Sequence, residues 1–216
     1  MTDPSTGRDA RTHLDSLVAD IDDGLDAGNR AREAALPACR RAIRHAGSSI
    51  RAVHRLDAAE AATLADACEV ALREAQAVLA PFPALAQAGY LHDAEKEFVE
   101  ARAVAALVAG APVPGPAELA VGPTAWMRGL AEATSELRRH LLDRLREGRL
   151  ERGEALLGAM DDVYGALVVV DYPDALTNGL RRTLDALRAV LERSRGDVTT
   201  TVLQTRLQRA IERAGG

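Results

Sequence analysis

Apolar residues recur every three or four positions along most of this chain, which is the spacing of one buried face of an α-helix. No stretch shows the strict alternation of a half-buried strand. The pattern predicts an all-α fold of about seven helices in a single helical bundle or superhelix. The expected helices cover residues 12–28, 30–56, 57–79, 83–108, 124–147, 150–170 and 175–194, with a further amphipathic segment at 199–214.

Glycine and proline mark the expected ends of these helices. Gly28 weakens the end of the first helix, and Gly196 is expected to end the seventh. The segment 110–123 is rich in glycine and proline and predicts a loop. Because helices flank this loop closely on both sides, we expect one domain over residues 1–216. Residues 1–10 are polar and are expected to be disordered.

Composition agrees with helices and narrows the class of protein. Hydrophobic residues make up 47% of the chain but aromatic residues only 3%, so alanine, leucine and valine must fill the core. The two cysteines, Cys39 and Cys68, have no CxxC pattern and no histidine at ligand spacing, which argues against a disulfide framework or a zinc site. Without a long apolar run or a signal-peptide layout, we expect a cytoplasmic protein with no membrane partner.

Charge is unevenly distributed around a formal net charge of -5. Residues 1–28 hold seven aspartates against two arginines, whereas residues 30–55 hold seven arginines and one acid, Glu33. An anionic polymer would be attracted to the second segment despite the overall sign. A GC-rich or salt-adapted genome is the alternative explanation for the arginine excess, since Lys96 is the only lysine.

Four of these arginines form a stripe along the second predicted helix. Arg40, Arg44, Arg51 and Arg55 fall at i, i+4, i+11 and i+15, and His54 lies beside them. Guanidinium groups pair with phosphates, so the stripe predicts contact with a nucleic-acid backbone. With few aromatic residues for base stacking, binding should be weakly sequence-selective and salt-dependent. The alternative is a solvated face, or salt bridges to the acidic first helix.

Three acids share one face of the fourth predicted helix. Asp93, Glu97 and Glu100 lie at i, i+4 and i+7. Clustered carboxylates are the ligands that Mg²⁺ prefers, and a bound ion could activate water and neutralise a phosphate. Taken alone, three acids on a helix face usually form a solvated surface.

Three segments, in consistent order over roughly residues 30–200, carry a family resemblance. The first is 49–55 (Ser-Ile-Arg-Ala-Val-His-Arg) and the second is 97–101 (Glu-Phe-Val-Glu-Ala). The third is the longest and has three parts: 129–139 (from Gly-Leu to Glu-Leu-Arg-Arg), 160–164 (Met to Tyr) and 171–182 (Asp-Tyr-Pro-Asp-Ala-Leu-Thr-Asn-Gly-Leu-Arg-Arg). Together they resemble the translin and translin-associated factor X family, and its archaeal members in particular. The resemblance implies a translin-type helical fold, a closed hollow homo-oligomer, commonly an octamer, and binding of RNA or single-stranded DNA.

In the factor X branch, the resemblance further implies a Mg²⁺-dependent endoribonuclease. Glu97 and Glu100 match that branch's catalytic pair. The expected third acidic position, directly after Tyr164, is Gly165 here, and Asp161 one turn earlier is the candidate substitute. Three hypotheses therefore stand: a nucleic-acid-binding protein, an endoribonuclease that uses these three acids, or a structural helical oligomer with no nucleic-acid ligand.

Overall fold

The computed structural model describes residues 4–214, with side chains from residue 11 onward, and all regular structure in this range is helical. This confirms the all-α prediction. The helices are α1 (Pro4–His54), α2 (Ala58–Leu79), α3 (Pro83–Ala86), α4 (Gly89–Ala109), α5 (Pro123–Arg146), α6 (Leu150–Val168), α7 (Asp174–Thr177) and α8 (Leu180–Ala214). Six of them are long, and α3 and α7 are single turns.

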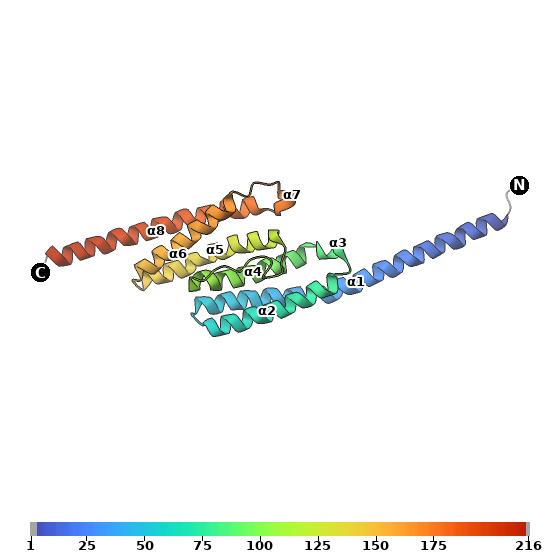
Figure 1. Ribbon diagram of the computed structural model, residues 1–216, viewed down its shortest axis with the longest axis horizontal. Coiled ribbons are helices and arrows are strands. Elements are labelled where there is room, and N and C mark those ends of the chain that lie inside the picture. The colour runs from blue at the N-terminus through green and yellow to red at the C-terminus, as the bar shows by residue number, and fades with distance from the viewer. Residues whose placement is uncertain (1–3, 215–216) are drawn as a thin grey trace.

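The long helices lie roughly side by side in an elongated molecule (Figure 1). The pair α1–α2 packs on the central pair α4–α5, and α5 in turn packs against α6 and α8. Small side chains allow these close contacts, because α1 buries Ala35, Ala38, Ala42 and Ala46 completely. Phe98 on α4 is also fully buried at the centre. The aromatic-poor composition is thus matched by tight helix-on-helix packing.

The first helix is a single element, where the sequence predicted two. α1 runs unbroken for 51 residues through Gly28. A Cβ atom at Gly28 would lie at ordinary contact distances, 3.7 Å from Leu85 and 3.9 Å from Phe82, so this part of α1 packs beside the α3 turn. Residues 4–10, expected to be disordered, belong to α1, and residues 1–3 lie outside the described range.

Three other helix boundaries also differ from the prediction. The expected helix 83–108 is divided into α3 and α4. The expected helix 175–194 breaks near its start, because Asn178 (φ 49°) and Gly179 (φ 81°) both take the left-handed conformation. After that break α8 continues through Gly196, which was expected to end it, and includes the segment 199–214.

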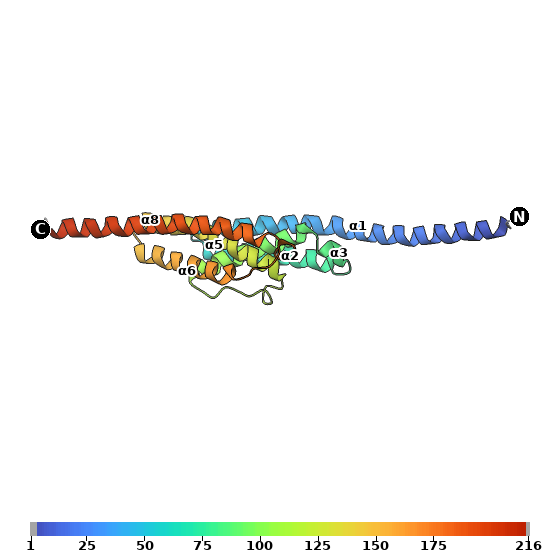
Figure 2. The ribbon, with the colours of Figure 1, turned by 90° about the horizontal axis from the view of Figure 1, so that it is seen from above.

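Both ends of the molecule are extended by unsupported helix. The N-terminal part of α1 and the C-terminal part of α8 project in opposite directions beyond the packed helices (Figures 1 and 2). The apolar face predicted for the first helix is exposed there. It consists of Leu14, Leu17, Val18, Ile21 and Leu25.

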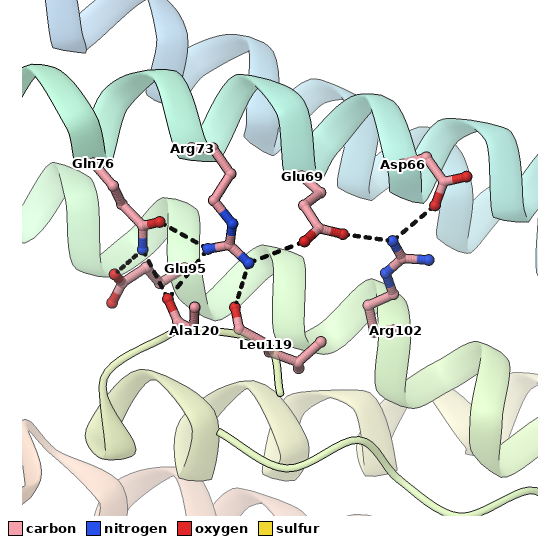
Figure 3. A network of polar contacts seen from close by, with 8 residues as sticks. All are labelled: Asp66, Glu69, Arg73, Gln76, Glu95, Arg102, Leu119 and Ala120. Atoms are coloured by element: carbon pink, nitrogen blue, oxygen red, sulfur yellow. Dashed lines mark hydrogen bonds and ion pairs between the residues drawn. The ribbon is translucent and has the colours of Figure 1, made fainter. Parts of the chain in front are cut away.

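The predicted loop is present and is held by polar contacts from α2 and α4 (Figure 3). Arg73 donates hydrogen bonds to the carbonyl oxygens of Leu119 at 2.7 Å and Ala120 at 3.2 Å. Gln76 donates to the Ala120 oxygen at 3.0 Å and to Glu95 at 2.8 Å. These bonds satisfy carbonyl groups that no helix supplies with a donor, so the loop is fixed to the surface of α2 and α4.

Within the described part of the chain, no helix combines the length and apolar character needed to cross a bilayer. The two cysteines are both buried and unpaired.

The closest helix contact depends on Gly129 of α5. A Cβ atom at this position would lie 2.5 Å from the Lys96 carbonyl oxygen and 2.8 Å from the Val99 Cβ atom. We expect Gly129→Ala to lower the free energy of unfolding by about 1–3 kcal/mol, because backbone would have to move. Gly196→Ala is the control: nothing lies within 4 Å there, and the change should raise stability by about 0.5–1 kcal/mol. Urea denaturation of both variants tests this, and equal effects would contradict it.

A candidate carboxylate site between α4 and α5

Three carboxylates meet where α4 contacts α5. Glu97 and Glu100 on α4 and Glu132 on α5 each offer one oxygen atom, and these oxygens all lie within 4.8 Å of one another. Glu132 is one turn along α5 from Gly129, at the point of closest helix approach. The missing side chain of Gly129 thus allows Glu132 to come close to the two acids of α4.

Lys96 partly neutralises this cluster. Its Nζ atom lies 3.0 Å from Glu97 and also donates to Glu132, and its side chain is only 10% exposed. Burial alone would lower the pKa of Lys96, but the hydrogen bonds and charges of Glu132 and Glu97 outweigh burial and raise it. The positive charge of Lys96 therefore offsets part of the repulsion among the three carboxylates.

Glu100 is the most buried of the three acids. It makes no hydrogen bond or ion pair with any residue in the described range, and only 8% of it is exposed. Burial, assisted by the negative charge of Glu97, raises the pKa of Glu100 from 4.5 to about 8. Glu100 is therefore largely protonated at neutral pH, and a cation placed beside it would favour its ionised form.

The donor set fits a hard divalent cation. Carboxylate oxygens are the preferred ligands of Mg²⁺, which also keeps several waters. Glu97, Glu100 and Glu132 would hold the ion, and the cation would take over the role that Lys96 plays towards Glu97 and Glu132.

A histidine–glutamate pair adjoins the cluster. The Nε2 atom of His54, at the end of α1, lies 3.0 Å from Glu136, one turn along α5 from Glu132. The hydrogen bond to His54 lowers the pKa of Glu136 although burial opposes it. The His54 side chain is 4% exposed. His54, expected to bind nucleic acid beside the arginines, therefore faces the protein interior and ties α1 to α5.

The four arginines of the stripe are all exposed, as the spacing predicted. Arg51 donates to Ser48 at 2.9 Å and Arg55 pairs with Glu60. Arg40 and Arg44 form no ion pair with any described residue. None of the four pairs with the acidic residues of α1 whose side chains the structure describes, from residue 11 onward, so salt bridges to those residues do not explain the stripe. In the described range, the partner of Asp26 in that segment is Arg30.

Two of the predicted acids lie outside the cluster. Asp93 is exposed on α4 and is not among the clustered carboxylates. Asp161 on α6 is held by Arg195 of α8, with 2.7 Å between its oxygen and the Arg195 Nη2 atom. Gly165 is exposed on α6 with open space around it. The third carboxylate of the cluster is thus Glu132, and Asp161 is engaged elsewhere.

The sequence contained weak signals for the residues that were missed. Lys96 is the only lysine in an arginine-rich chain and lies between two of the acids of α4. Gly129, Glu132 and Glu136 follow one another at helical spacing on α5. Neither signal identifies the helix that faces α4, and that pairing is what assembles the site.

No protein-family model matches the chain. An uncharacterized protein of Methanocaldococcus jannaschii is 32% identical over 136 residues, which cover 62% of this chain and 60% of that protein. The chain therefore matches less than two thirds of this relative's length.

Solved structures match over nearly their whole length. The crystal structure of AfC3PO has a TM-score of 0.81 and 29% identity, covering 87% of this chain and 97% of AfC3PO. AfC3PO in complex with duplex RNA has a TM-score of 0.70 at the same identity and coverage. Apo-NeC3PO, with a TM-score of 0.76 and 16% identity over 85% of this chain and 96% of its own, shares the fold.

Helical order, elongated shape and these likenesses define an all-α protein of the C3PO type. In fold and, at 29% identity, in sequence, the chain is similar to AfC3PO, which supports its resemblance to the archaeal members of the translin family.

Glu100 gives this site a pH-dependent stability. Because its pKa is raised from 4.5 to about 8, the folded state binds more protons than the unfolded state in that window, and stability falls as pH rises through it. We expect Glu100→Gln to be more stable than the native protein above pH 8, by roughly 2–4 kcal/mol, and to converge with it below pH 4.5. Chemical denaturation across pH measures this. Asp93→Asn, an exposed acid on the same helix, is the control, and a parallel pH profile for Glu100→Gln would refute the assignment.

Proposed function

We propose that this protein binds RNA through the phosphate backbone, using the arginine stripe of α1. The observation that carries the proposal is that Arg40 and Arg44 are exposed and have no acidic partner among the described residues. Guanidinium groups in this state can pair with phosphate oxygens without breaking an existing salt bridge. The complex of AfC3PO with duplex RNA supports the same ligand class.

The end of α1 that carries Arg51 and Arg55 is joined to α5 by His54. His54 lies between Arg51 and Arg55 in the sequence and bonds to Glu136, which is one turn from Glu132. We propose that a strand following the arginines reaches the end of α1 that His54 joins to α5. Since aromatic residues are few, we expect contacts to phosphate and sugar, weak sequence preference and binding to single-stranded DNA as well.

A second activity is favoured by the geometry of the cluster. We infer that Glu97, Glu100 and Glu132 hold Mg²⁺ for endoribonucleolytic cleavage. The bound ion would supply an activated water and neutralise charge on the phosphate. The three carboxylates would hold the ion, and Lys96, which pairs with Glu97 and Glu132, would supply positive charge beside it.

We further propose that the protein is a homo-oligomer. The exposed apolar faces at both ends of the molecule support this, because a monomer would leave them in water. An octamer is the size that the family resemblance leads us to expect, and light scattering measures it.

RNA binding is tested by removing the two unpaired arginines. We expect the double variant Arg40→Gln, Arg44→Gln to bind single-stranded RNA about tenfold or more weakly at 0.1–0.2 M salt, and to show a smaller salt dependence, because two phosphate contacts are lost. Arg182→Gln removes another exposed arginine, on α8, and this variant should bind as the native protein does. Fluorescence anisotropy over a salt series measures both. Salt-insensitive or absent binding by the native protein would favour the structural-oligomer hypothesis.

Cleavage is tested by comparing two acids. Loss of a residue that only hydrogen-bonds to a metal ligand lowers metal affinity or activity about 10–100-fold. Because Glu132 is proposed as a direct ligand, Glu132→Ala should reduce Mg²⁺-dependent RNA cleavage by at least about a hundredfold. Asp161→Ala should cleave normally, because Asp161 is bound to Arg195. Gel assays with Mg²⁺ or EDTA distinguish them. The reverse result would reinstate Asp161 as the third ligand, and no cleavage by the native protein would leave binding as the function.

A further inference from the structure

A partly buried arginine lies one turn from the carboxylate cluster. Arg128 precedes Glu132 by four residues on α5, so both side chains leave the same face of the helix. The side chain of Arg128 is only 22% exposed. A guanidinium group buried to this extent needs partners for its five N–H donors, so its contacts show whether it is already satisfied within the chain.

The contacts of Arg128 leave most of those donors unused. Its Nη1 atom lies 3.4 Å from the Nε2 atom of His92 on α4, which is a long hydrogen bond. Its Nη2 atom lies 3.8 Å from Glu132, beyond hydrogen-bond distance. Its Nε atom is buried and has no hydrogen-bond partner among the described residues. Arg128 therefore carries a charge that no described acid neutralises through a hydrogen bond.

His92 does not supply the missing negative charge. An arginine only donates hydrogen bonds, so the Nε2 atom of His92 accepts this one and carries no proton. Burial, followed by the charge of Arg128, lowers the pKa of His92. The imidazole is therefore neutral at pH 7, where it orients the guanidinium group and leaves the charge of that group uncompensated.

A second arginine of α5 shows how an internal partner would look. The side chain of Arg138 is 25% exposed, similar to that of Arg128. Its Nη2 atom lies 2.8 Å from an oxygen of Asp197, and its Nη1 atom donates to Ser194 at 3.1 Å. Arg138 is thus satisfied by the helix that it contacts, whereas Arg128 keeps donors for an anion from outside the chain.

The register of α4 and α5 places Arg128 beside the cluster. His92 contacts Arg128 and Lys96 contacts Glu132, and the residues of each pair are 36 positions apart. The two helices therefore run in the same direction along this contact, with Arg128 about 6 Å before Glu132. Of the two oxygens of Glu132, Oε2 accepts from Lys96 and Oε1 is the one near Arg128. A group bound at the cluster thus has a guanidinium group within reach on one side.

We propose that Arg128 binds an oxygen atom of the phosphate group that is held at the carboxylate cluster. This inference rests on the nucleic-acid binding proposed above and adds to it a residue that contacts the substrate. Phosphate oxygens match the paired N–H groups of a guanidinium group, so a phosphodiester can satisfy the free donors of Arg128. The positive charge of Arg128 would also offset the repulsion between that phosphate and the three acids.

The test replaces Arg128 and measures binding of a labelled single-stranded DNA in Mg²⁺, with a gel to confirm that the DNA stays intact. We expect Arg128→Gln to bind about tenfold more weakly than the native protein at about 0.15 M salt, because a bidentate phosphate contact is lost. The dependence of log affinity on log salt should become shallower by about 0.7, the value for one phosphate of a single strand. Arg128→Lys keeps the charge and should recover part of the affinity. Fluorescence anisotropy measures these quantities.

Arg138→Gln is the matched control, since this arginine is similarly buried on the same helix but is paired with Asp197. It should bind the DNA as the native protein does.

Calorimetric titration with Mg²⁺ alone separates a substrate contact from a purely structural role. When Arg128 binds phosphate, Arg128→Gln should bind Mg²⁺ at least as tightly as the native protein, because a positive charge beside Glu132 is removed. When Arg128 only positions Glu132, the same variant would bind Mg²⁺ more weakly and DNA normally. That second result would overturn the proposal.

The outcomes also distinguish this contact from nucleic-acid binding in general. A native protein that binds no nucleic acid would refute both proposals. Binding that weakens in the double variant Arg40→Gln, Arg44→Gln but not in Arg128→Gln would refute the Arg128 contact alone. Circular dichroism and urea denaturation show whether each variant is folded. Where Arg128→Gln is unstable, Arg128→Met keeps a long side chain without charge and should show the same loss of DNA affinity; native-like affinity in it would refute the contact.

Discussion

The approach of α5 to α4 at Gly129 is the contact on which the rest of the structure depends. At this point the backbone of α4 occupies the space where any side chain larger than hydrogen would sit. The contact brings Glu132 to Glu97 and Glu100, and it places Phe98 and Val99 at the centre of the core. One small residue thus determines both the packing of the middle helices and the separation of three acids.

The same contact makes the site energetically expensive. Buried carboxylates lose hydration, which is why the pKa of Glu100 rises and why Lys96 is needed between Glu97 and Glu132. A chain selected for stability alone would place apolar residues between two such closely packed helices. That three acids occur there instead is the pattern expected of a functional site, where stability is given up for chemistry.

Much of the fold follows from the sequence, and what does not has identifiable causes. Periodicity predicts the long helices and proline predicts the loop, because both are local properties of the chain. Gly28 and Gly196 do not end helices, since glycine only weakens a helix, whereas Asn178 with Gly179 ends one by taking left-handed conformations. Periodicity also identifies the apolar face at the N-terminal part of α1, but it does not show that this face lies outside the core.

The residues of the site also divide into those that the sequence predicts and those that it does not. Glu97 and Glu100 could be paired from the sequence because they lie one turn apart on one helix. Glu132 could not, since its position depends on which helix packs against α4. Asp161 was predicted from its spacing to Gly165 along α6, but its side chain bonds to Arg195 of α8 and does not join the cluster. Contacts between helices carry the information that sequence spacing lacks.

A single helix, α1, carries both the acidic residues of segment 11–26 and the arginine stripe, and distance keeps their electrostatic effects apart. Asp26 and Arg40 are 14 residues apart, which is about 21 Å along a helix. The Debye length at physiological ionic strength is about 8 Å, so the aspartates are screened from a polyanion bound at the arginines. At 0.01 M salt the screening length grows to about 30 Å, so the aspartates would then repel that polyanion. The net charge of -5 therefore does not predict what binds at the acidic segment or at the arginine stripe. At physiological ionic strength the electrostatic field of each surface decays over a distance shorter than the helix that joins them.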